Sequence, residues 1–392
     1  MADATQRTAL IAHPGAELYG SDRVMLETLA GLVEGGWRVV LAVPAGGPLL
    51  DTARDLGAEI VLLDVPVLRK SVLKPANLPR FLTGSLAASR RIDLLLRDVR
   101  PDVVYVSTLT VPLWVVRARA HRIPVLCHVH ESERQAPLLL REAIAWPLRL
   151  ADRVVANSLF SLDSLTEVMP SLLGRSTVVY NGVPGPGEIR PARAELIGGL
   201  RVVYVGRLSP RKGVDVAVAA VALLADSGFD AHLDLVGGVF SGYEWYEQEL
   251  RSQVAWLGIE DRVTFSGFQP SVWHALADAD VAVVPSRLEE PFGNTAVEAV
   301  LAARPVVVSA IGGLAEAIDG FASAVPVDPD DPVRLAEALH RIAADWPAFR
   351  LTAAAAAPDA ARRYAPESYR RAMTTELERI AGVPADTGVL VP

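Results

Sequence analysis

The sequence contains very little cysteine, with Cys127 as the single thiol in 392 residues. One thiol excludes an intrachain disulfide framework and a cysteine-built metal cluster, which is typical of proteins in a reducing compartment. Long apolar runs are also missing, because stretches such as 216–225 have about half of the roughly 18 to 20 residues that a membrane-spanning helix needs. The first apolar segment is too short for a signal peptide. These absences predict a cytoplasmic protein without a membrane-spanning segment.

An excess of positive charge is absent as well. The chain has 38 Lys and Arg against 46 Asp and Glu, which gives a net charge of −8. A protein whose whole surface binds nucleic acid would be basic, so this balance argues against a nucleic-acid partner. The apolar fraction of 51% is typical of packed cores, and the length predicts two or three domains.

Short runs of Val, Ile and Leu alternate with amphipathic stretches along the chain. This alternation is typical of parallel sheets covered by helices on both faces, so the predicted fold class is α/β, with two Rossmann-like, doubly wound domains. The expected strands lie at residues 8–13, 38–44, 59–65, 102–107, 124–130, 153–157 and 177–180 in the first half, and at 201–206, 232–236, 262–266, 281–285, 305–309 and 324–327 in the second.

A stretch rich in proline and glycine separates the two halves and is interpreted as a linker over residues 184–199. The predicted domains are therefore 1–183 and 200–365. A last helix over 366–382 is expected to return to the N-terminal domain, and the tail 383–392 to be frayed. Doubly wound domains bind ligands at the carboxyl ends of their strands, so the active site is expected in a central cleft that the two domains face.

The segment GRLSPRKG, residues 206–213, places Arg207 and Lys212 in the loop before a helix predicted to begin near Gly213, so that both flank its N-terminus. Cations there oppose the helix macrodipole, so an anion such as a diphosphate, bound between them and to backbone amides, is the best explanation of their presence. A pair of solvated surface cations is the structural alternative.

The segment EEPFGNTAVE, residues 289–298, places Glu290 in a loop and Glu298 one turn into a helix that begins near Asn294 or Thr295. Two carboxylates at this reach can accept hydrogen bonds from sugar hydroxyls, and the loop offers backbone amides. A capping box formed by Thr295 and Glu298 is an alternative explanation of Glu298, but it does not explain Glu290.

Two features of the first half are weaker signals. Gly15 and Gly20 follow the first strand, where glycine lets the backbone approach a phosphate or sugar, although turn chemistry alone could require both. His130 ends the strand 124–130, and its imidazole could transfer a proton or bind a hydroxyl. A structural role is the alternative for His130 and the favoured one for His128. His13 has no distinguishing spacing and is left out of the predicted site.

These motifs together resemble the retaining GT-B glycosyltransferases of family 4, also described as glycosyl transferases group 1. The likeness extends over roughly residues 8–335, through GAELYGSDRV, VHES, VVYNGV, GRLSPRKG, LVGG and EPFGNTAVE. It implies a hexosyl- or related transferase that moves a sugar from a nucleotide donor, bound by the C-terminal domain, to a hydroxyl acceptor on the N-terminal domain. Retention of configuration, and a place in bacterial glycan, glycolipid or secondary-metabolite biosynthesis, are further implications.

The resemblance also implies roles for single residues. Arg207 and Lys212 would hold the donor diphosphate and neutralise the charge that builds on it as the glycosidic bond breaks. Glu298 would bind the ribose, and Glu290, together with the amides of residues 292–294, would bind the transferred sugar and the distal phosphate. The predicted catalytic residues are His130 and Glu290, and the predicted donor-binding residues are Gly20, Arg207, Lys212, Phe292, Gly293, Asn294, Thr295 and Glu298.

Asp278 and Asp280 resemble the D-x-D metal motif of other sugar transferases. They precede a predicted strand, where they would cap a helix end, and two cations already match diphosphate binders. No metal and no bound cofactor are therefore expected, and the co-substrate is expected to be a UDP- or GDP-sugar.

The segment from Arg69 to Arg100 is basic and rich in leucine in an otherwise acidic chain. It could lie on anionic lipid at the inner face of the membrane and guide a lipid-linked acceptor, with residues 134–149 extending the same surface. A solvated helix face is the alternative. Two rival functions also stay open: a nucleotide-sugar epimerase of the same architecture, and a non-catalytic protein that binds a sugar nucleotide.

Overall fold

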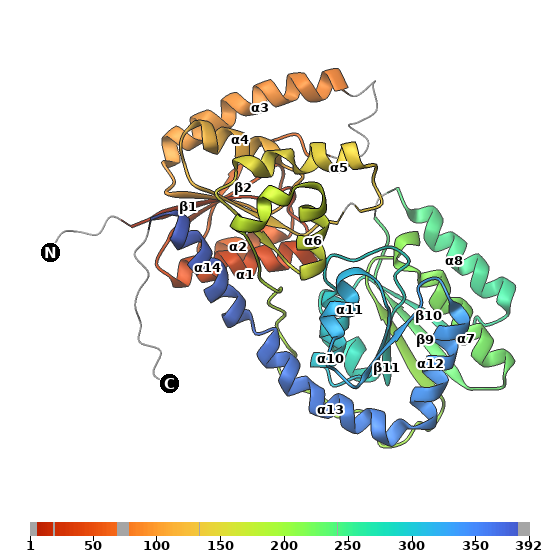
Figure 1. The fold of residues 1–392 in the computed structure, drawn as a ribbon. Helices are drawn as coiled ribbons and strands as arrows, with labels where there is room; N and C mark the ends of the chain where they lie inside the picture. Colours follow the sequence, from red (N-terminus) through yellow and green to blue (C-terminus); the bar gives the residue numbers. More distant parts are fainter. Residues whose placement is uncertain (1–5, 19, 69–77, 133, 241, 383–392) are drawn as a thin grey trace, which may run out of the picture. The chain divides into compact units, whose positions relative to one another are not determined.

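A computed structural model describes residues 6–18, 20–68, 78–132, 134–240 and 242–382. The chain forms two compact units (Figure 1). Unit 1 consists of Met1–Gly182 and Pro366–Pro392, and unit 2 of Val183–Ala365. Each unit is built on one parallel sheet, which confirms the predicted α/β class with two Rossmann-like domains.

The sheet of unit 1 has the strand order β3-β2-β1-β4-β5-β6-β7. Its direction of growth changes between β1 and β4, because Ala9 of β1 pairs with Val39 of β2 on one side and with Val103 of β4 on the other. Such a reversal is where doubly wound sheets bind ligands. The strands are β1 (Thr8–Ala12), β2 (Arg38–Val43), β3 (Glu59–Leu62), β4 (Val103–Val106), β5 (Val125–Val129), β6 (Arg153–Ala156) and β7 (Ser176–Val178).

Helices cover both faces of this sheet (Figure 1). Because side chains alternate along a strand, Leu10 packs toward α3 and α4, whereas Ile11 packs toward α1 and α14. The helices are α1 (Gly20–Glu34), α2 (Leu49–Asp55), α3 (Leu78–Val99), α4 (Pro112–Ala120), α5 (Leu138–Ala145), α6 (Leu159–Val168) and α14 (Pro366–Ile380), with the short 3₁₀ segments η2 (Trp146–Leu150) and η3 (Pro170–Arg175).

The last helix, α14, packs on α1 within unit 1. A Cβ atom on Gly31 would stand 2.9 Å from the Cβ atom of Arg370, so the two helices approach closely at this glycine. The Tyr369 hydroxyl lies 2.6 Å from the Thr28 hydroxyl. Contacts of this kind explain why the end of the chain belongs to the first compact unit.

The sheet of unit 2 has the order β10-β9-β8-β11-β12-β13. Its strands are β8 (Leu200–Val205), β9 (Ala231–Val236), β10 (Val263–Gly267), β11 (Val281–Val284), β12 (Val306–Ser309) and β13 (Ala324–Val327). The helices are α7 (Val214–Asp226), α8 (Glu244–Leu257), α9 (Trp273–Asp278), α10 (Asn294–Leu301), α11 (Gly312–Ile318), α12 (Pro332–Ala344) and α13 (Trp346–Arg363), with the 3₁₀ segment η4 (Pro210–Lys212). Every predicted strand in both units has an observed counterpart, with ends that agree within three residues.

The segment 184–199, interpreted from its sequence as a linker, lies within unit 2. Arg193 donates through Nε to Asp280 at 2.8 Å, and the Trp346 indole donates to the Arg193 carbonyl at 2.9 Å. The fully buried Arg304 reaches the carbonyl of Arg190 at 3.0 Å. The prolines and glycines break periodicity here, but the side chains between them fasten the segment to the domain that follows.

No helix in the described parts of the chain combines the length and the apolar character that crossing a membrane requires.

Candidate functional site

Two residues from separate sequence motifs of unit 2 are in direct contact. The Lys212 ammonium lies 2.7 Å from Glu290 Oε1 and donates to Oε2 at 2.9 Å, while the Ser286 hydroxyl donates to Oε1 at 2.8 Å. The carboxylate is nearly buried. Burial acts to raise the pKa of Glu290. The charges of Lys212 and Arg211 and the two hydrogen bonds outweigh this effect, so the net shift of the pKa is downward. Glu290 is therefore an ionised, firmly held carboxylate.

The backbone holds this pair in place. The Arg211 carbonyl accepts hydrogen bonds from the amides of Arg287 at 2.9 Å and Leu288 at 3.3 Å, and the Arg211 guanidinium donates to the Glu289 carbonyl at 2.9 Å. Gly213 caps α7 at a φ of 63°, and a Cβ atom there would stand 1.9 Å from the Pro285 carbonyl. Only glycine lets the two loops approach this closely, and their approach brings Lys212 to Glu290.

Arg207 directly follows Gly206 at the carboxyl end of β8. Its carbonyl accepts a hydrogen bond from the Tyr204 hydroxyl at 2.7 Å, and its guanidinium lies 4.0 Å from the centre of the Phe240 ring. A Cβ atom on Gly237 would stand 1.8 Å from the Gly206 carbonyl, so the loops after β8 and β9 also require glycine. Arg207 thus lies at the carboxyl edge, stacked on an aromatic ring.

The EPFGN segment, residues 290–294, contains one buried side chain, that of Phe292. Phe292 is buried and meets the Tyr364 ring edge-on at 5.6 Å, so only its main chain is available to a ligand. Gly293 has a φ of 133°, and a Cβ atom there would stand 2.7 Å from Leu314 Cδ2. Asn294 and Thr295 are half-buried at the first turn of α10.

The capping-box explanation of Glu298 is wrong. The residue that caps α10 is Gly293, which has no side chain, and Thr295 lies inside the helix rather than before it. Glu298 follows in the second turn and is half-buried. Ribose binding by Glu298 stays the prediction.

The two aspartates of the D-x-D sequence do not converge. Asp280 is fully buried and accepts hydrogen bonds from Arg193 and from the Arg201 amide at 2.8 Å, whereas Asp278 is exposed, 3.5 Å from Arg190. Throughout the described ranges, no cluster of three or more His, Cys, Asp or Glu could hold a metal ion. Asp280 fastens the segment 184–199 to the start of β8.

In unit 1, polar residues follow the carboxyl ends of four neighbouring strands. His13 comes after β1, Ser107 after β4, His130 after β5 and Asn157 after β6. The His130 ring lies 3.9 Å from that of His128, and its Nδ1 atom lies 3.5 Å from the Asn157 amide nitrogen. These residues form the polar edge of the sheet on which the predicted His130 lies.

His130 is a neutral imidazole in this environment. Burial lowers its pKa to about 3, and the nearby His13 lowers it further while Asp22 opposes the shift. A group with this pKa carries no proton to give at neutral pH beyond its ring N–H. It can therefore orient a hydroxyl by hydrogen bonding, and it is not an imidazolium acid.

His13 was left out of the predicted site, but its ring is held by two buried side chains. Its Nδ1 atom lies 2.6 Å from the Ser107 hydroxyl, and Nε2 lies 2.9 Å from Asp22 Oδ1 in the first turn of α1. All three residues are buried. The sequence signal for His13 was its position. His13, Ser107 and His130 are each the first residue after one of three neighbouring strands, β1, β4 and β5. Gly20, the predicted contact nearby, begins α1 and is exposed.

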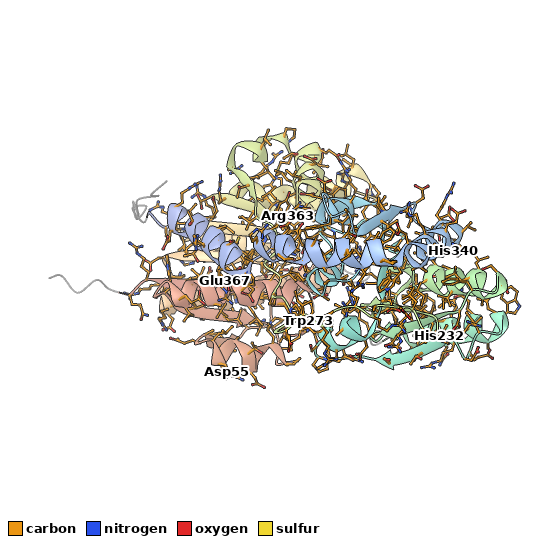
Figure 2. The ribbon with its side chains drawn as sticks, turned by 90° about the horizontal axis from the view of Figure 1, so that it is seen from below. Asp55, His232, Trp273, His340, Arg363 and Glu367 are labelled. Atoms are coloured by element: carbon orange, nitrogen blue, oxygen red, sulfur yellow. The ribbon has the colours of Figure 1, made fainter. Side chains whose placement is uncertain are left out.

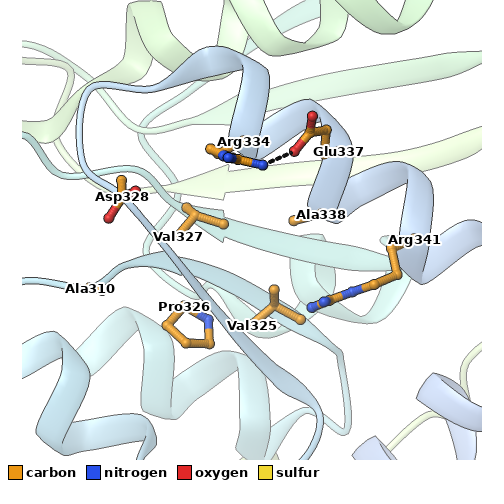
Figure 3. Close-up of a pocket in the computed structure, with 9 residues that line it drawn as sticks. All are labelled: Ala310, Val325, Pro326, Val327, Asp328, Arg334, Glu337, Ala338 and Arg341. Atoms are coloured by element: carbon orange, nitrogen blue, oxygen red, sulfur yellow. Dashed lines mark hydrogen bonds and ion pairs between the residues drawn. The ribbon is translucent and has the colours of Figure 1, made fainter.

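Other polar features of unit 2 lie outside this arrangement. A hollow of about 490 Å³ between β13 and α12 is lined by Arg334, Glu337 and Arg341 and contains no predicted site residue (Figure 3). His232 lies at the amino end of β9 beside Asp230, and His340 packs against Phe229 (Figure 2). These histidines are remote from the carboxyl edge where Arg207 lies.

Comparison with known proteins adds independent information. The family model for glycosyltransferase family 4 matches residues 19–184, and that for glycosyl transferases group 1 matches residues 199–345. The chain is 30% identical to D-inositol 3-phosphate glycosyltransferase 1 of Catenulispora acidiphila, over 88% of this chain and 87% of that protein. It is 29% identical to the 2-deoxystreptamine glucosyltransferase of Streptomyces kanamyceticus, over 75% of this chain and 81% of that one.

Solved structures share the fold at lower identity. The crystal structure of Anabaena Alr3699/HepE in complex with UDP and glucose has a TM-score of 0.79 and 20% identity, covering 94% of this chain and 99% of that one. A glycosyltransferase from Rickettsia africae has a TM-score of 0.76 and 17% identity, covering 96% and 99%.

Proposed function

The chain belongs to the glycosyl transferases of group 1 and is a glycosyltransferase with the GT-B fold, and on that premise we propose that it is a retaining enzyme. It transfers a sugar from a nucleotide-diphosphate sugar to a hydroxyl acceptor. Unit 2 binds the donor, and the polar edge of unit 1 binds the acceptor. The observation that carries this proposal is the Lys212–Glu290 contact, which joins the two motifs predicted to bind the donor.

The donor diphosphate is the leaving group. Its bond to the anomeric carbon breaks, the acceptor oxygen forms the new bond on the same face, and the acceptor proton passes to the departing phosphate oxygen. Arg207 and Lys212 neutralise the charge that develops on the diphosphate. The Lys212 ammonium has three N–H donors. Its contacts with the two Glu290 oxygens use at most two of these donors, which leaves one for a phosphate oxygen.

Glu290 and His130 act on sugar hydroxyls in this proposal. The lowered pKa of Glu290 keeps its carboxylate ionised as a hydrogen-bond acceptor. The neutral ring of His130 orients a hydroxyl without competing for the acceptor proton. Glu298 binds the ribose, while Gly20, Asn294, Thr295 and the backbone of Phe292 and Gly293 complete the donor contacts.

A UDP-sugar is favoured over a GDP-sugar, and no metal ion is required. The UDP complexes of the Anabaena structure support the nucleotide, and the commitment of Asp280 to Arg193 and Arg201 supports metal independence. The named acceptors of the two bacterial relatives, an inositol phosphate and 2-deoxystreptamine, support a small hydroxyl-rich acceptor.

We place the enzyme in the cytoplasm, with α3 in contact with the inner face of the membrane. Leu86 and Leu94 are 71% and 65% exposed on this helix, beside the exposed Arg90 and Arg97. Asp93 does not offset this charge at the surface, because it pairs with Arg117 at 2.7 Å and with His121 at 2.9 Å. Arg69, Lys70 and Lys74 of the predicted basic segment lie outside the described residues, as does the side chain of Arg80.

The test combines binding and turnover on the full chain. UDP and GDP, with their common sugar conjugates, are titrated in a thermal-shift assay, since a ligand that binds the native state raises the melting temperature. Arg207→Ala and Lys212→Ala should each weaken nucleotide binding at least about tenfold, whereas the matched Arg251→Ala on α8 should not. Unchanged binding in the first two variants would refute the diphosphate assignment.

Incubation with donor alone separates the rival functions. A transferase gives at most slow hydrolysis, an epimerase produces a new sugar nucleotide, and a non-catalytic protein binds without any turnover. Glu290→Gln should reduce transfer at least about a hundredfold. Conversion of the donor into a second sugar nucleotide would refute the proposed reaction.

A further inference from the structure

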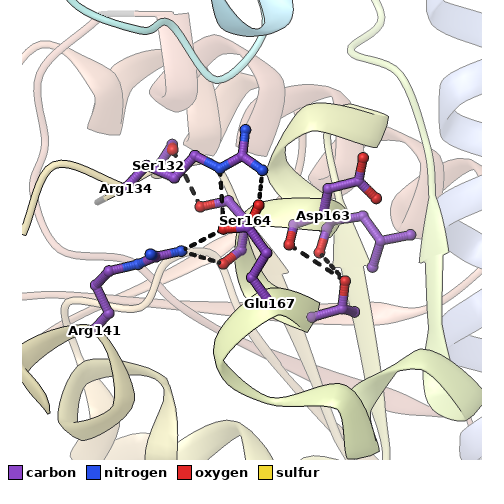
Figure 4. A network of polar contacts seen from close by, with 8 residues as sticks. Ser132, Arg134, Arg141, Asp163, Ser164 and Glu167 are labelled. Atoms are coloured by element: carbon purple, nitrogen blue, oxygen red, sulfur yellow. Dashed lines mark hydrogen bonds and ion pairs between the residues drawn. The ribbon is translucent and has the colours of Figure 1, made fainter. Parts of the chain in front are cut away.

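Two arginines of unit 1 converge on one carboxylate (Figure 4). Arg134 donates through Nε to Glu167 Oε2 at 3.1 Å and also through Nη2 to Oε1, and Arg141 donates through Nη2 to Oε2 at 3.0 Å. Glu167 is the acidic partner of both guanidinium groups within the described residues. Among the described contacts, two guanidinium groups therefore share one carboxylate.

The guanidinium groups are fixed by contacts other than Glu167. Arg134 lies over the Phe160 ring, with its guanidinium carbon 5.1 Å from the ring centre. Arg141 donates to the Ser164 carbonyl at 3.0 Å, and its side chain is only 14% exposed. Phe160 and Ser164 both belong to α6, and the Ser132 hydroxyl also lies 3.3 Å from the Ser164 hydroxyl. Two cations held in this way form a preorganised fork for an anion.

Glu167 is poorly suited to its position. It stands in the last turn of α6, where the helix macrodipole disfavours a negative charge. Its side chain is 44% exposed, so it can leave the fork toward solvent. The two parallel N–H donors of a guanidinium group can bind the two oxygens of a carboxylate or two oxygens of a phosphate. Glu167 therefore occupies the place that an external anion of higher charge would take.

The location connects this fork to the reaction. Ser132 and Arg134 belong to the loop that begins with His130 at the carboxyl end of β5. Glu131, in the same loop, accepts from the His130 amide at 3.0 Å and from the Thr108 hydroxyl. These two hydrogen bonds tie Glu131 to the segments that follow β4 and β5, and Glu167 is the carboxylate that contacts both arginines in the described part of the chain.

We propose that the Arg134–Arg141 pair binds a phosphomonoester carried by the acceptor, which displaces Glu167. A phosphomonoester carries a charge of about −1.5 to −2 at neutral pH, so it balances both guanidinium groups where Glu167 balances one. The assignment of the phosphomonoester to the acceptor rests on the function proposed above, whereas the anion site itself rests on the contacts shown in Figure 4. Its specificity is for a phosphorylated hydroxyl compound.

The test uses inorganic phosphate as the probe, titrated by calorimetry at constant ionic strength. Glu167→Gln removes the competing carboxylate and should raise phosphate affinity about three- to fivefold. Arg141→Gln should lower it at least about tenfold, and Arg141→Lys should be intermediate because it retains the charge without the fork. Glu142→Gln, an exposed acid on α5, is the matched control and should change nothing.

Phosphate could also bind at Arg207 and Lys212, so a double variant isolates the fork. The gain from Glu167→Gln should vanish in Glu167→Gln/Arg141→Gln if the phosphate lies on the fork. A gain that persists in the double variant, or unchanged phosphate affinity in Glu167→Gln, would overturn the proposal. Far-ultraviolet circular dichroism and melting temperatures establish that each variant is folded.

Two competitors identify the source of the phosphate. Glycerol 3-phosphate represents a soluble acceptor, and phosphatidylcholine vesicles that contain phosphatidic acid represent a lipid headgroup. Displacement of inorganic phosphate by glycerol 3-phosphate alone supports a soluble acceptor, and displacement by both supports a lipid-linked one. Displacement by neither would contradict a phosphomonoester site.

Nucleotide-sugar turnover by the same proteins keeps this proposal separate from the proposed function. If the phosphate measurements follow the prediction but the wild-type chain consumes no nucleotide sugar, the anion site stands and the proposed function fails. If sugar transfer is observed while Glu167→Gln leaves phosphate affinity unchanged, only the anion site fails.

Discussion

The Lys212 ammonium lies 2.7 Å from the Glu290 carboxylate, although 78 residues separate them in the chain. Both groups lie largely out of solvent, with side chains 22% and 12% exposed. Removal of one partner from such a pair leaves the other as an uncompensated charge in a poorly solvated place. Their contact therefore affects both the stability of unit 2 and the electrostatics of its carboxyl edge.

Lys212→Met should destabilise the protein by about 3 kcal/mol at neutral pH, and the loss should shrink as the pH falls. Folding lowers the pKa of Glu290 below 4.5, so in the wild type this carboxylate adds stability above pH 4.5 that is lost as the pH falls through its folded pKa. In the variant the unpaired carboxylate is relieved by protonation instead. Denaturant unfolding at several pH values measures this.

The control for this variant is Arg251→Met, which breaks an exposed pair with Glu247 on α8. It should change the free energy of unfolding by less than about 1 kcal/mol at any pH. A Lys212→Met variant that behaves like this control would contradict the buried pair.

His130→Gln should flatten the acid-side loss of stability. Burial lowers the pKa of His130 to about 3 from an ordinary 6.5, so between these values the unfolded chain binds the proton and the folded chain does not. Wild-type stability from this group is therefore complete above pH 6.5 and falls toward pH 3. Unfolding free energies measured across that range should fall less steeply in the variant.

A matched histidine tests whether this effect is specific. His232 is 44% exposed on β9, so His232→Gln controls for the loss of a histidine that is not buried. Equal slopes in the wild type and the His130 variant would show that His130 is protonated normally. The His130 variant should also lower kcat by about a hundredfold.

Gly213→Ala should weaken both stability and nucleotide binding. A methyl group at this φ of 63° would stand 1.9 Å from the Pro285 carbonyl, so the loop that carries Lys212 must shift. Gly258 has nearly the same φ, 67°, with open space around it, and Gly258→Ala should cost only the backbone strain of about 1 kcal/mol. Thermal melts and UDP titration compare the two; similar behaviour of both variants would exclude a steric requirement at Gly213.

Asp280→Asn should destabilise the fold by about 3 kcal/mol, because Arg193 loses the charge of its buried partner. The transfer activity of the folded protein should stay complete in excess chelator. Asp278→Asn, at the exposed position of the same sequence, should have no effect beyond about 0.5 kcal/mol. Melting temperatures and chelator-treated assays measure the two effects. Loss of activity in chelator, restored by a divalent ion, would revive a metal role.

Leu86→Ser/Leu94→Ser should reduce binding to vesicles that contain anionic lipid at least about tenfold, because both exposed side chains would insert beside arginines. Co-sedimentation measures this, and high salt should weaken the wild-type interaction. Trp256→Ser replaces an even more exposed apolar side chain, 84% exposed on α8, and should bind as the wild type does. Wild-type protein that stays in the supernatant at low salt would refute the membrane contact.

The sequence by itself determined the α/β class, the strands and the family. Buried parallel strands must be apolar on both faces, so runs such as Val306–Ser309 are visible without any tertiary information. Glycines that permit close backbone approach, such as Gly213 and Gly293, also leave a local signature in the sequence. The motifs that contain Arg207, Lys212 and Glu290 are also visible in the sequence, and the donor site that they predict stays a prediction.

Tertiary structure alone decided which side chains meet. His13 reaches Asp22 and Ser107, and Arg134 and Arg141 share Glu167, only because parallel strands and the helices that follow them align distant residues at one edge or face. Likewise, α10 begins at Asn294 with Gly293 as its N-cap. Thr295 therefore cannot be the N-cap of the capping box that the sequence of Thr295 and Glu298 predicts. Local patterns report backbone conformation and burial, whereas partners in contact depend on the register between elements, which no local pattern contains.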